Sequence, residues 1–319
     1  MSARAQLIED GGAAAAEPEF FRSAEFLDAE GVTHTLRIEA GDGELAAPLI
    51  VRGIRGGDRR DAASPYGFPG FAVDEARIRA TAGDQARAAL DPDRIDFGPT
   101  GLVAVFIRHR LGDPPLSRTS ARNVVQVADP ELPRKSRSSD RNRVNRNRRA
   151  GYEVRIVSGP DAGEEERSGF HRAYEETMRR TEAAERYLFG RAYFDRLLGS
   201  DRAWLALALA PGGEVAAGSL TVESDGFLHY YLSGSTDAHL ADSPMKNLVT
   251  ALVDLAEERG LPLNLGGGIA RGDRLEEFKR GFANRELPWH TSEIICDPDA
   301  YAALSAGRPP SDFFPLYRS

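Results

Sequence analysis

Apolar residues recur with helical spacing at two places in the second half of the chain. One stripe covers residues 245–256 and is closed by Gly260, and another links Phe170, Tyr174 and Met178. Between the two stripes, apolar runs bounded by turn residues predict strands. These runs are 203–209, 215–222 and 227–232. Helices and strands therefore alternate in this half of the chain.

Shorter patterns predict the remaining elements. Strands are expected at 35–39, 48–52, 102–107, 124–127, 153–157, 262–265 and 289–296, and helices at 136–150, 190–198 and 273–282. The stretch Ser64–Gly70 reads SPYGFPG, and its Pro and Gly residues predict a tight loop. Together the patterns predict an α/β fold with mixed sheets.

Length and composition are those of a globular protein. The 319 residues suit one large domain or two ordinary ones, and 41% hydrophobic with 28% charged residues disfavours disorder and coiled coil. No apolar run approaches the ~18 residues of a membrane span, and residues 1–20 resemble a flexible tail rather than a secretory signal. The single cysteine, Cys296, excludes an internal disulfide. We expect a soluble cytoplasmic protein.

Charge is distributed unevenly. The whole chain carries −8, but residues 134–149 contain eight Lys or Arg against one acid, Asp140. This stripe carries +7, so the other residues together carry −15. It could hold the phosphates of a polyanion, or it could be a solvated helix face or a linker.

The familiar motifs of metal and nucleotide sites are missing. The six histidines do not form an H-E-x-x-H or similar spacing, and one cysteine cannot build a thiolate site, so no metal is expected. There is no G-x-S-x-G elbow and no phosphate loop. The triple glycine Gly266–Gly268 does not fit a dinucleotide fingerprint and by itself predicts a tight turn.

The segment that follows this turn carries a more specific signal. Residues 265–282 read LGGGIARGDRLEEFKRGF. They resemble the Fem family of non-ribosomal peptidyltransferases in the GNAT-like superfamily, in which a strand ends in Gly-Gly-Gly and Asp-x-Leu-x-x-Phe-Lys-x-x-Phe follows. The matching positions here are Gly266, Gly267, Gly268, Asp273, Leu275, Phe278, Lys279 and Phe282.

Other pieces match the same family in the same order. They are Ser64-Pro-Tyr-Gly67, Thr177-x-x-Arg180, Tyr193-Phe194, His229-Tyr-Tyr-Leu-Ser-Gly-Ser235 and Ser243-Pro244. Each piece alone is a weak signal, but the ordered set spans residues 64–282 and is fairly specific.

The resemblance implies two GNAT-like domains facing one another across a cleft. Domain 1 would cover 21–155, with 298–319 returning to it, and domain 2 would cover 156–297. The implied reaction transfers an aminoacyl group from aminoacyl-tRNA, the co-substrate, to an amine of a natural-product intermediate or a peptidoglycan precursor. An aminoacyl ester is already activated, so no further cofactor is expected.

The resemblance also implies roles for individual residues. Lys279 matches the family lysine and would stabilise the negative charge that develops on the ester carbonyl. Phe278 would stack on the terminal adenosine, or would pack in the core with Leu275 and Phe282. Asp273 belongs to the same motif and is assigned to substrate binding.

Further candidates lie outside this motif. Arg180 would hold acceptor phosphate or carboxylate groups, and Tyr66 would shape the acceptor end of the cleft. His229 and Tyr231 should share one strand face; Tyr231 is a candidate for substrate binding, and His229 is either a general base or a satisfied core histidine. The arginines predicted to bind tRNA are Arg143, Arg146 and Arg149.

Two rival functions remain open. An acyl-CoA-dependent N-acyltransferase of the same superfamily would carry [QR]-x-x-G-x-[GA] before the helix that follows the central strand, yet residues 235–247 after Gly234 contain no glycine. A tRNA- or nucleotide-binding protein without catalytic activity would use the basic stripe alone.

Overall fold

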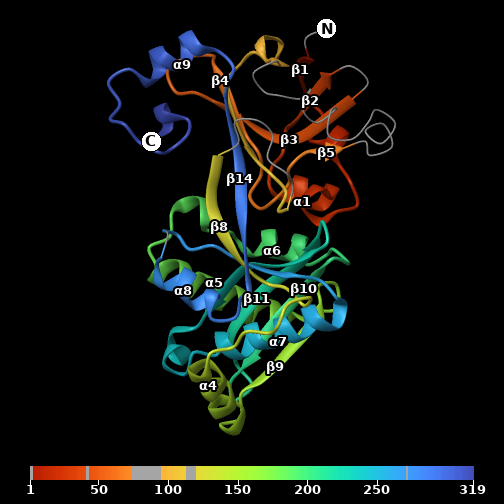
Figure 1. Ribbon diagram of the computed structural model, residues 1–319, viewed down its shortest axis with the longest axis vertical. Coiled ribbons are helices and arrows are strands. Elements are labelled where there is room, and N and C mark those ends of the chain that lie inside the picture. The colour runs from red at the N-terminus through yellow and green to blue at the C-terminus, as the bar shows by residue number, and fades with distance from the viewer. Residues whose placement is uncertain (1–2, 41–42, 74–94, 113–119, 271) are drawn as a thin grey trace. The chain divides into compact units, whose positions relative to one another are not determined.

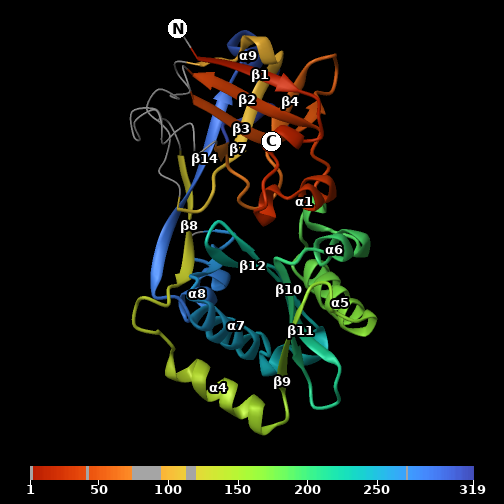
Figure 2. The same cartoon turned by 90° about the vertical axis from the view of Figure 1, so that its right-hand side faces the viewer.

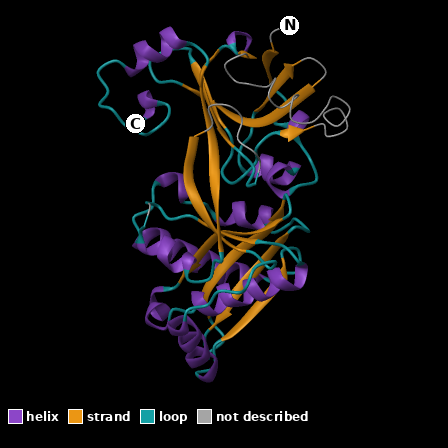
Figure 3. Cartoon of the chain, in the orientation of Figure 1, coloured by secondary structure: helices purple, strands orange, loops and turns teal. Residues whose placement is uncertain are grey.

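The chain forms two compact units, each described by itself. The computed structural model describes residues 3–40, 43–73, 95–112, 120–270 and 272–319. Unit 1 comprises Met1–Arg122 and Pro288–Ser319, and unit 2 comprises Asn123–Leu287. The predicted α/β class with mixed sheets is confirmed, and Figure 3 shows the helices and strands. The predicted cleft between two domains stays a prediction.

Unit 1 is built on a mixed sheet with the strand order β6-β1-β2-β3-β4-β7-β14, and β5 pairs with β3. Its elements are β1 (Ala3–Ile8), α1 (Ala24–Ala29), β2 (His34–Ala40), β3 (Gly43–Gly53), β4 (Arg60–Ala63), β5 (Ala72–Val73), β6 (Ile95–Asp96), β7 (Leu102–Arg108), β14 (Arg285–Ile295) and α9 (Pro298–Ser305). Pairing is antiparallel from β1 to β4 and between β7 and β14, and parallel for β4 with β7.

The N-terminal residues differ from the prediction of a flexible tail over residues 1–20. Strand β1 pairs with β2 in antiparallel register from Arg4 to Ile8, and Ala3 and Ala5 lie in the core of unit 1. Ala15, within the alanine run, is also fully buried. Alternate burial and backbone hydrogen bonds to β2 therefore fix a segment that composition alone suggested was mobile.

The sheet strands of unit 2 follow the order β8-β13-β12-β11-β10-β9. Its elements (Figure 1) are β8 (Ser120–Ala128), α4 (Ser138–Arg149), β9 (Glu153–Ser158), α5 (Glu164–Arg180), α6 (Arg191–Leu197), β10 (Ala203–Leu209), β11 (Val215–Ser224), β12 (Phe227–Ser235), α7 (Met245–Arg259), β13 (Leu263–Gly266) and α8 (Arg274–Arg280). Strands β9 to β12 are antiparallel neighbours, whereas β12 and β13 are parallel.

Helices cover both faces of this sheet. Figure 2 shows α5 and α6 on one side of strands β10 to β12 and α7 on the other. The backbone of α5 lies close to β12 at Gly234, where an added Cβ would lie 2.3 Å from the carbonyl oxygen of Ala173. Leu248 and Leu252 of α7 and Leu263 of β13 belong to one buried cluster. The amphipathic stripe predicted for α7 therefore faces the core.

The unit boundaries differ from the predicted domain limits. The chain passes between units within β8, after Arg122, and within β14, after Leu287, rather than near residues 155 and 297. Helix α4 belongs to unit 2 because Asp140, Val144 and Asn147 are buried and the helix packs against α7. The basic stripe is thus part of the same unit as the Gly-Gly-Gly motif.

Strands β12 and β13 are paired over a short distance only. The pairs are Leu228–Leu263 and His229–Asn264. Strand β12 then continues to Ser235, and β13 ends at Gly266. The turn after β13 leads to α8, which carries the predicted catalytic lysine.

Candidate active site

Lys279 lies in the last turn of α8 and its side chain reaches back to the glycine turn. The residue is 9% exposed, and its Nζ donates a hydrogen bond to the carbonyl oxygen of Gly267 at 2.7 Å. Gly266 has φ of 77°, and a Cβ there would lie 3.0 Å from the Lys279 Nζ. The left-handed backbone and the close ammonium explain why glycine occupies this position.

Asp273 shapes the same turn. As the N-cap of α8 it accepts a hydrogen bond from the Glu276 N–H at 2.7 Å, and it also accepts from the N–H groups of Ile269 (2.7 Å) and Ala270 (2.9 Å). These backbone hydrogen bonds lower the pKa of the Asp273 carboxyl, chiefly the one from Glu276. Its predicted role was substrate binding, but its described contacts shape the turn.

Two further residues hold this turn, and sequence reasoning missed both. Asn123 on β8 donates from Nδ2 to the carbonyl oxygen of Gly268 at 3.1 Å. Glu276, which is 3% exposed, accepts from the Gly272 N–H at 2.8 Å and pairs with Arg280. Asn123 precedes the turn by 145 positions, so only the pairing of β8 with β13 brings it there.

Burial sets the electrostatics of Lys279. Desolvation lowers its pKa to about 8, and the Asp273 carboxylate partly opposes this shift. No ion pair of Lys279 occurs within the described part of the chain, and its one hydrogen bond is to Gly267. An ammonium has three N–H donors, so two remain for a group that develops negative charge.

His229 does not have the geometry of a general base. It is 2% exposed, its Nε2 lies 3.2 Å from the carbonyl oxygen of Ser224, and its Nδ1 lies 3.0 Å from Nδ2 of Asn264. Burial lowers its pKa to about 4. Both ring nitrogens are engaged inside the protein, so the catalytic assignment is replaced by that of a satisfied core histidine.

Phe278 and Tyr231 occupy different surroundings. Phe278 packs against the cluster under α7, and its ring lies 5.5 Å from that of Phe282, so its contacts favour core packing with Phe282. Leu275, the other partner named in that alternative, is 41% exposed. The Tyr231 hydroxyl lies 3.4 Å from the hydroxyl of Tyr193 on α6, while Tyr230 packs on the α7 side. Tyr231 therefore faces the helix pair α5–α6.

Arg180 ends α5 and is engaged by the chain that follows β12. Its guanidinium pairs with Asp237 and donates to the carbonyl oxygen of Ser235 at 3.3 Å and to the Thr177 hydroxyl at 3.0 Å. These contacts fasten the end of β12 to α5. In unit 1, Tyr66 lies in the predicted turn, where its N–H donates to Glu30 at 2.8 Å.

Helix α4 presents arginines to solvent while its other face is fixed. Arg146 and Arg149 are exposed, and Arg143 is half-buried. Within the described residues, none of the three makes an ion pair with a carboxylate. On the packed face, Asp140 pairs with Lys246 of α7 at 2.7 Å, and Asn147 donates to Asn247 Oδ1 at 2.8 Å.

The N-terminus of α7 is closed by its own chain. Within its first turn, the N–H groups of Lys246 and Asn247 donate to the carbonyl oxygens of Ser243 and Pro244 at 3.0 Å. A pyrophosphate held at a helix N-terminus needs such N–H groups as donors. This geometry, together with the missing glycines before α7, disfavours a CoA pyrophosphate site.

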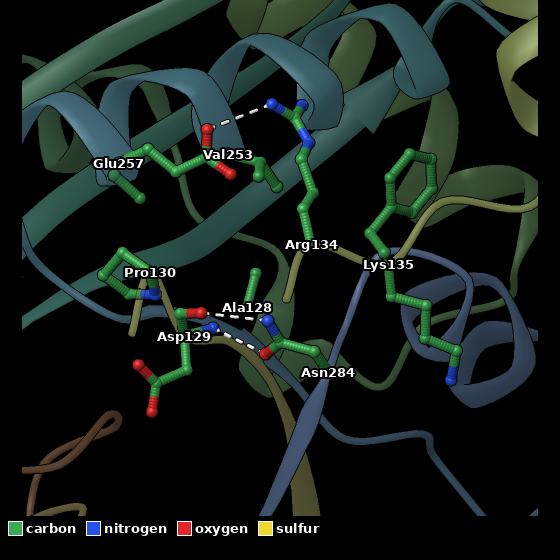
Figure 4. Close-up of a pocket in the computed structure, with 10 residues that line it drawn as sticks. Ala128, Asp129, Pro130, Arg134, Lys135, Val253, Glu257 and Asn284 are labelled. Carbon is green, nitrogen blue, oxygen red and sulfur yellow. Dashed lines mark hydrogen bonds and ion pairs between the residues drawn. The ribbon is translucent and has the colours of Figure 1, made fainter. Parts of the chain in front are cut away.

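Unit 2 contains two hollows that Lys279 does not line. The first has a volume of about 10 Å³, room for one water at most, and lies where Asn284 bonds to Asp129 (Figure 4). On its rim, Arg134 pairs with Asp254 and Glu257, so this member of the basic stripe is neutralised locally. The second, of about 410 Å³, is an open hollow lined by residues of β9, of α5 and of the turn between β10 and β11. None of the predicted site residues lines either hollow.

The described residues hold no group of three or more His, Cys, Asp or Glu side chains arranged to bind a metal ion. Among their helices, none has the length and apolar character needed to cross a membrane.

Comparisons with known proteins identify proteins of similar fold. Residues 134–280 match the model of an acetyltransferase (GNAT) domain, and no curated protein sequence matches the chain. The structure of L-PGS from Bacillus licheniformis is similar, with a TM-score of 0.55 and 14% identity over 86% of this chain and 87% of that one. FemX is similar with a TM-score of 0.56 and 12% identity over 84% and 90%. Residues 134–280 therefore form a GNAT-like domain, and the predicted resemblance to Fem-type proteins is confirmed in the fold.

Proposed function

We propose that the chain is an aminoacyltransferase that moves an amino acid from aminoacyl-tRNA to an amine and forms an amide bond. The match to a GNAT domain supports an acyltransferase, and the fold shared with FemX supports an aminoacyl donor. One observation carries the proposal: a desolvated ammonium, Lys279, is held by a backbone carbonyl beside a glycine turn and keeps two N–H donors.

The chemistry needs little more than this group and correct alignment. The acceptor nitrogen attacks the ester carbonyl carbon, the new C–N bond forms, and the bond to the ribose oxygen breaks. The amine proton leaves with that oxygen, so atoms and charge balance without a metal. Lys279 would donate to the carbonyl oxygen while it carries negative charge, and a lost contact of this kind costs ~3–4 kcal/mol, or roughly 100–1000-fold in rate.

Helix α4 supplies the proposed tRNA contact. Arg143, Arg146 and Arg149 project from a helix that is fixed to α7 by buried polar contacts. Arginines on a rigid surface attract the phosphates of a nucleic acid over several ångströms, in a salt-dependent way. A tRNA donor would place the activity in the cytoplasm.

The acceptor is proposed as an amine of a natural-product intermediate or a muropeptide. Tyr66 and Tyr231 are the candidates for contacts to it, because neither is fully buried. Arg180 is a weaker candidate for contacts to the acceptor, because its guanidinium already pairs with Asp237.

An acyl-CoA-dependent N-acyltransferase is the second candidate, favoured by the GNAT acetyltransferase match. The closed N-terminus of α7 argues against it, because the N–H groups that would hold the pyrophosphate donate within the turn. A protein that only binds tRNA is the third reading, and the α4 arginines alone would satisfy it.

The test supplies a mixture of tRNAs charged with labelled amino acids, together with amino-sugar and cell-wall precursor amines. Labelled product that disappears after RNase treatment is the expected result. Product formed from acetyl-CoA in the parallel reaction, insensitive to RNase, would select the second candidate. Binding of tRNA without product from any acceptor would select the third.

A further inference from the structure

A chain of buried polar groups connects β11 and β12 to the glycine turn. His229 bridges the carbonyl oxygen of Ser224 and the side chain of Asn264, and both His229 and Asn264 are 2% exposed. Asn264 Oδ1 accepts a hydrogen bond from the Gly266 N–H at 2.8 Å. The next residue, Gly267, supplies the carbonyl oxygen that binds Lys279.

The direction of each hydrogen bond follows from the donors and acceptors. Because Asn264 Oδ1 accepts from a backbone N–H, its Nδ2 must be the group that faces His229. Nδ2 is a donor, so His229 Nδ1 accepts and Nε2 carries the proton that goes to Ser224. The low pKa of His229, about 4, agrees with a ring that stays neutral.

We propose that His229 and Asn264 are positioning residues for the transfer reaction: through the Gly266 N–H they fix the Gly267 carbonyl that holds the Lys279 ammonium. Gly266 links the two halves of this network, because its φ of 77° turns the chain from β13 toward Lys279. A buried hydrogen-bond network of this kind specifies one geometry when every member is satisfied. The inference rests on the proposed function, which gives Lys279 its role.

The experiment is a double-mutant cycle measured by single-turnover transfer from aminoacyl-tRNA. His229→Phe keeps the ring and removes both nitrogens, so we expect a rate about tenfold lower. Lys279→Ala should lose roughly 100–1000-fold. If His229 acts through Lys279, the variant carrying both changes should be no slower than Lys279→Ala.

His229→Gln separates positioning from proton transfer. A glutamine oxygen can accept from Asn264 and its amide can donate to Ser224, but an amide does not act as a base. We expect His229→Gln to recover most of the activity, within about threefold of the original protein. Because its side chain can make both hydrogen bonds, this variant also serves if His229→Phe fails to fold.

The control is His171→Phe, the same substitution on α5, where the ring contacts Phe194 and lies 3.8 Å from Glu175. It should leave the rate unchanged. Losses from His229→Phe and Lys279→Ala that multiply, or a His229→Gln variant as slow as His229→Phe, would overturn the positioning role. A Lys279→Ala variant with full activity would remove the role of Lys279 on which the inference rests, whereas an original protein that forms no RNase-sensitive product would overturn the proposed function.

Discussion

Unit 2 carries positive charge in two settings, the buried turn around Lys279 and the exposed face of α4. Lys279 is 9% exposed and is bound by one backbone carbonyl, whereas Arg146 and Arg149 extend into solvent. A desolvated cation acts strongly on a charge that appears at one fixed point. Exposed arginines act at longer range and are screened by salt. Under the proposed function the two regions would serve different tasks, the buried lysine in the chemistry at the ester and the exposed arginines in binding the tRNA.

The largest expected effect separates the two regions directly. Lys279→Ala should lower the transfer rate by roughly 100–1000-fold and leave the Kd for tRNA unchanged. Single-turnover rates and a filter-binding assay give the two quantities. A parallel loss of tRNA affinity would show that the buried cation serves capture instead.

Reversing the charge on α4 should have the opposite result, a weaker tRNA affinity with little change in the transfer rate. Glutamates at Arg143, Arg146 and Arg149 should weaken tRNA binding by about tenfold or more and flatten its dependence on salt. The transfer rate at saturating tRNA should stay within a few fold of the original. Binding that does not change would mean that this helix face is merely solvated.

A matched variant controls for net charge. Glutamates at the exposed Arg155, Arg172 and Arg186 change the total charge by the same amount elsewhere in unit 2. Their effect on tRNA affinity should be clearly smaller. Equal losses in both triple variants would point to the overall charge rather than to α4.

The attachment of α4 should respond to a smaller change. Asn147→Ala removes the hydrogen bonds to Asn247 and to the carbonyl oxygen of Asp242, both at 2.8 Å. Leaving these buried partners unsatisfied should lower the free energy of unfolding by about 1–3 kcal/mol in urea titrations. Asn145→Ala, at an exposed position of the same helix, should change it by less than about 0.5 kcal/mol. Equal losses of stability in the Asn147→Ala and Asn145→Ala variants would contradict a stabilising role for the buried hydrogen bonds of Asn147.

The pH dependence of stability tests the desolvation of Lys279. Its pKa is about 8 in the folded chain and 10.5 as the ordinary value, so the unfolded chain binds more protons between these values. The stabilising contribution is complete above pH 10.5 and is lost as pH falls through 8. Relative to Lys279→Met, the original protein should therefore gain stability from pH 8 to 10.5. A constant difference in urea unfolding would show that the lysine is solvated.

Local patterns were sufficient for much of unit 2. The helices predicted from the stripe at 245–256 and at 136–150 agree with Met245–Arg259 and Ser138–Arg149. They were insufficient for β1, whose six residues include an alternation of small alanines and become a strand only through pairing with β2. Composition could not supply that long-range partner.

In the candidate site, too, local spacing could be predicted from the sequence and long-range contacts could not. The Asp273-to-Lys279 spacing predicted one helix, and α8 does bring Lys279 back to the glycine turn. The support from Asn123 and Asn264 depends on strand pairing, and a sequence gives no sign of which distant amide will face a given backbone group. The same holds for His229, where only the surrounding donors and acceptors distinguish a base from a structural ring.

The central claim is that a protonated Lys279 assists ester aminolysis, and its most direct test is the pH dependence of single-turnover transfer. Lys279 loses its proton as the pH rises. The transfer rate should therefore fall at alkaline pH, with a midpoint near the Lys279 pKa of about 8. Lys279→Arg keeps its charge across this range, so whatever activity it retains should lack that fall. The same fall in both proteins, or in neither, would contradict the account.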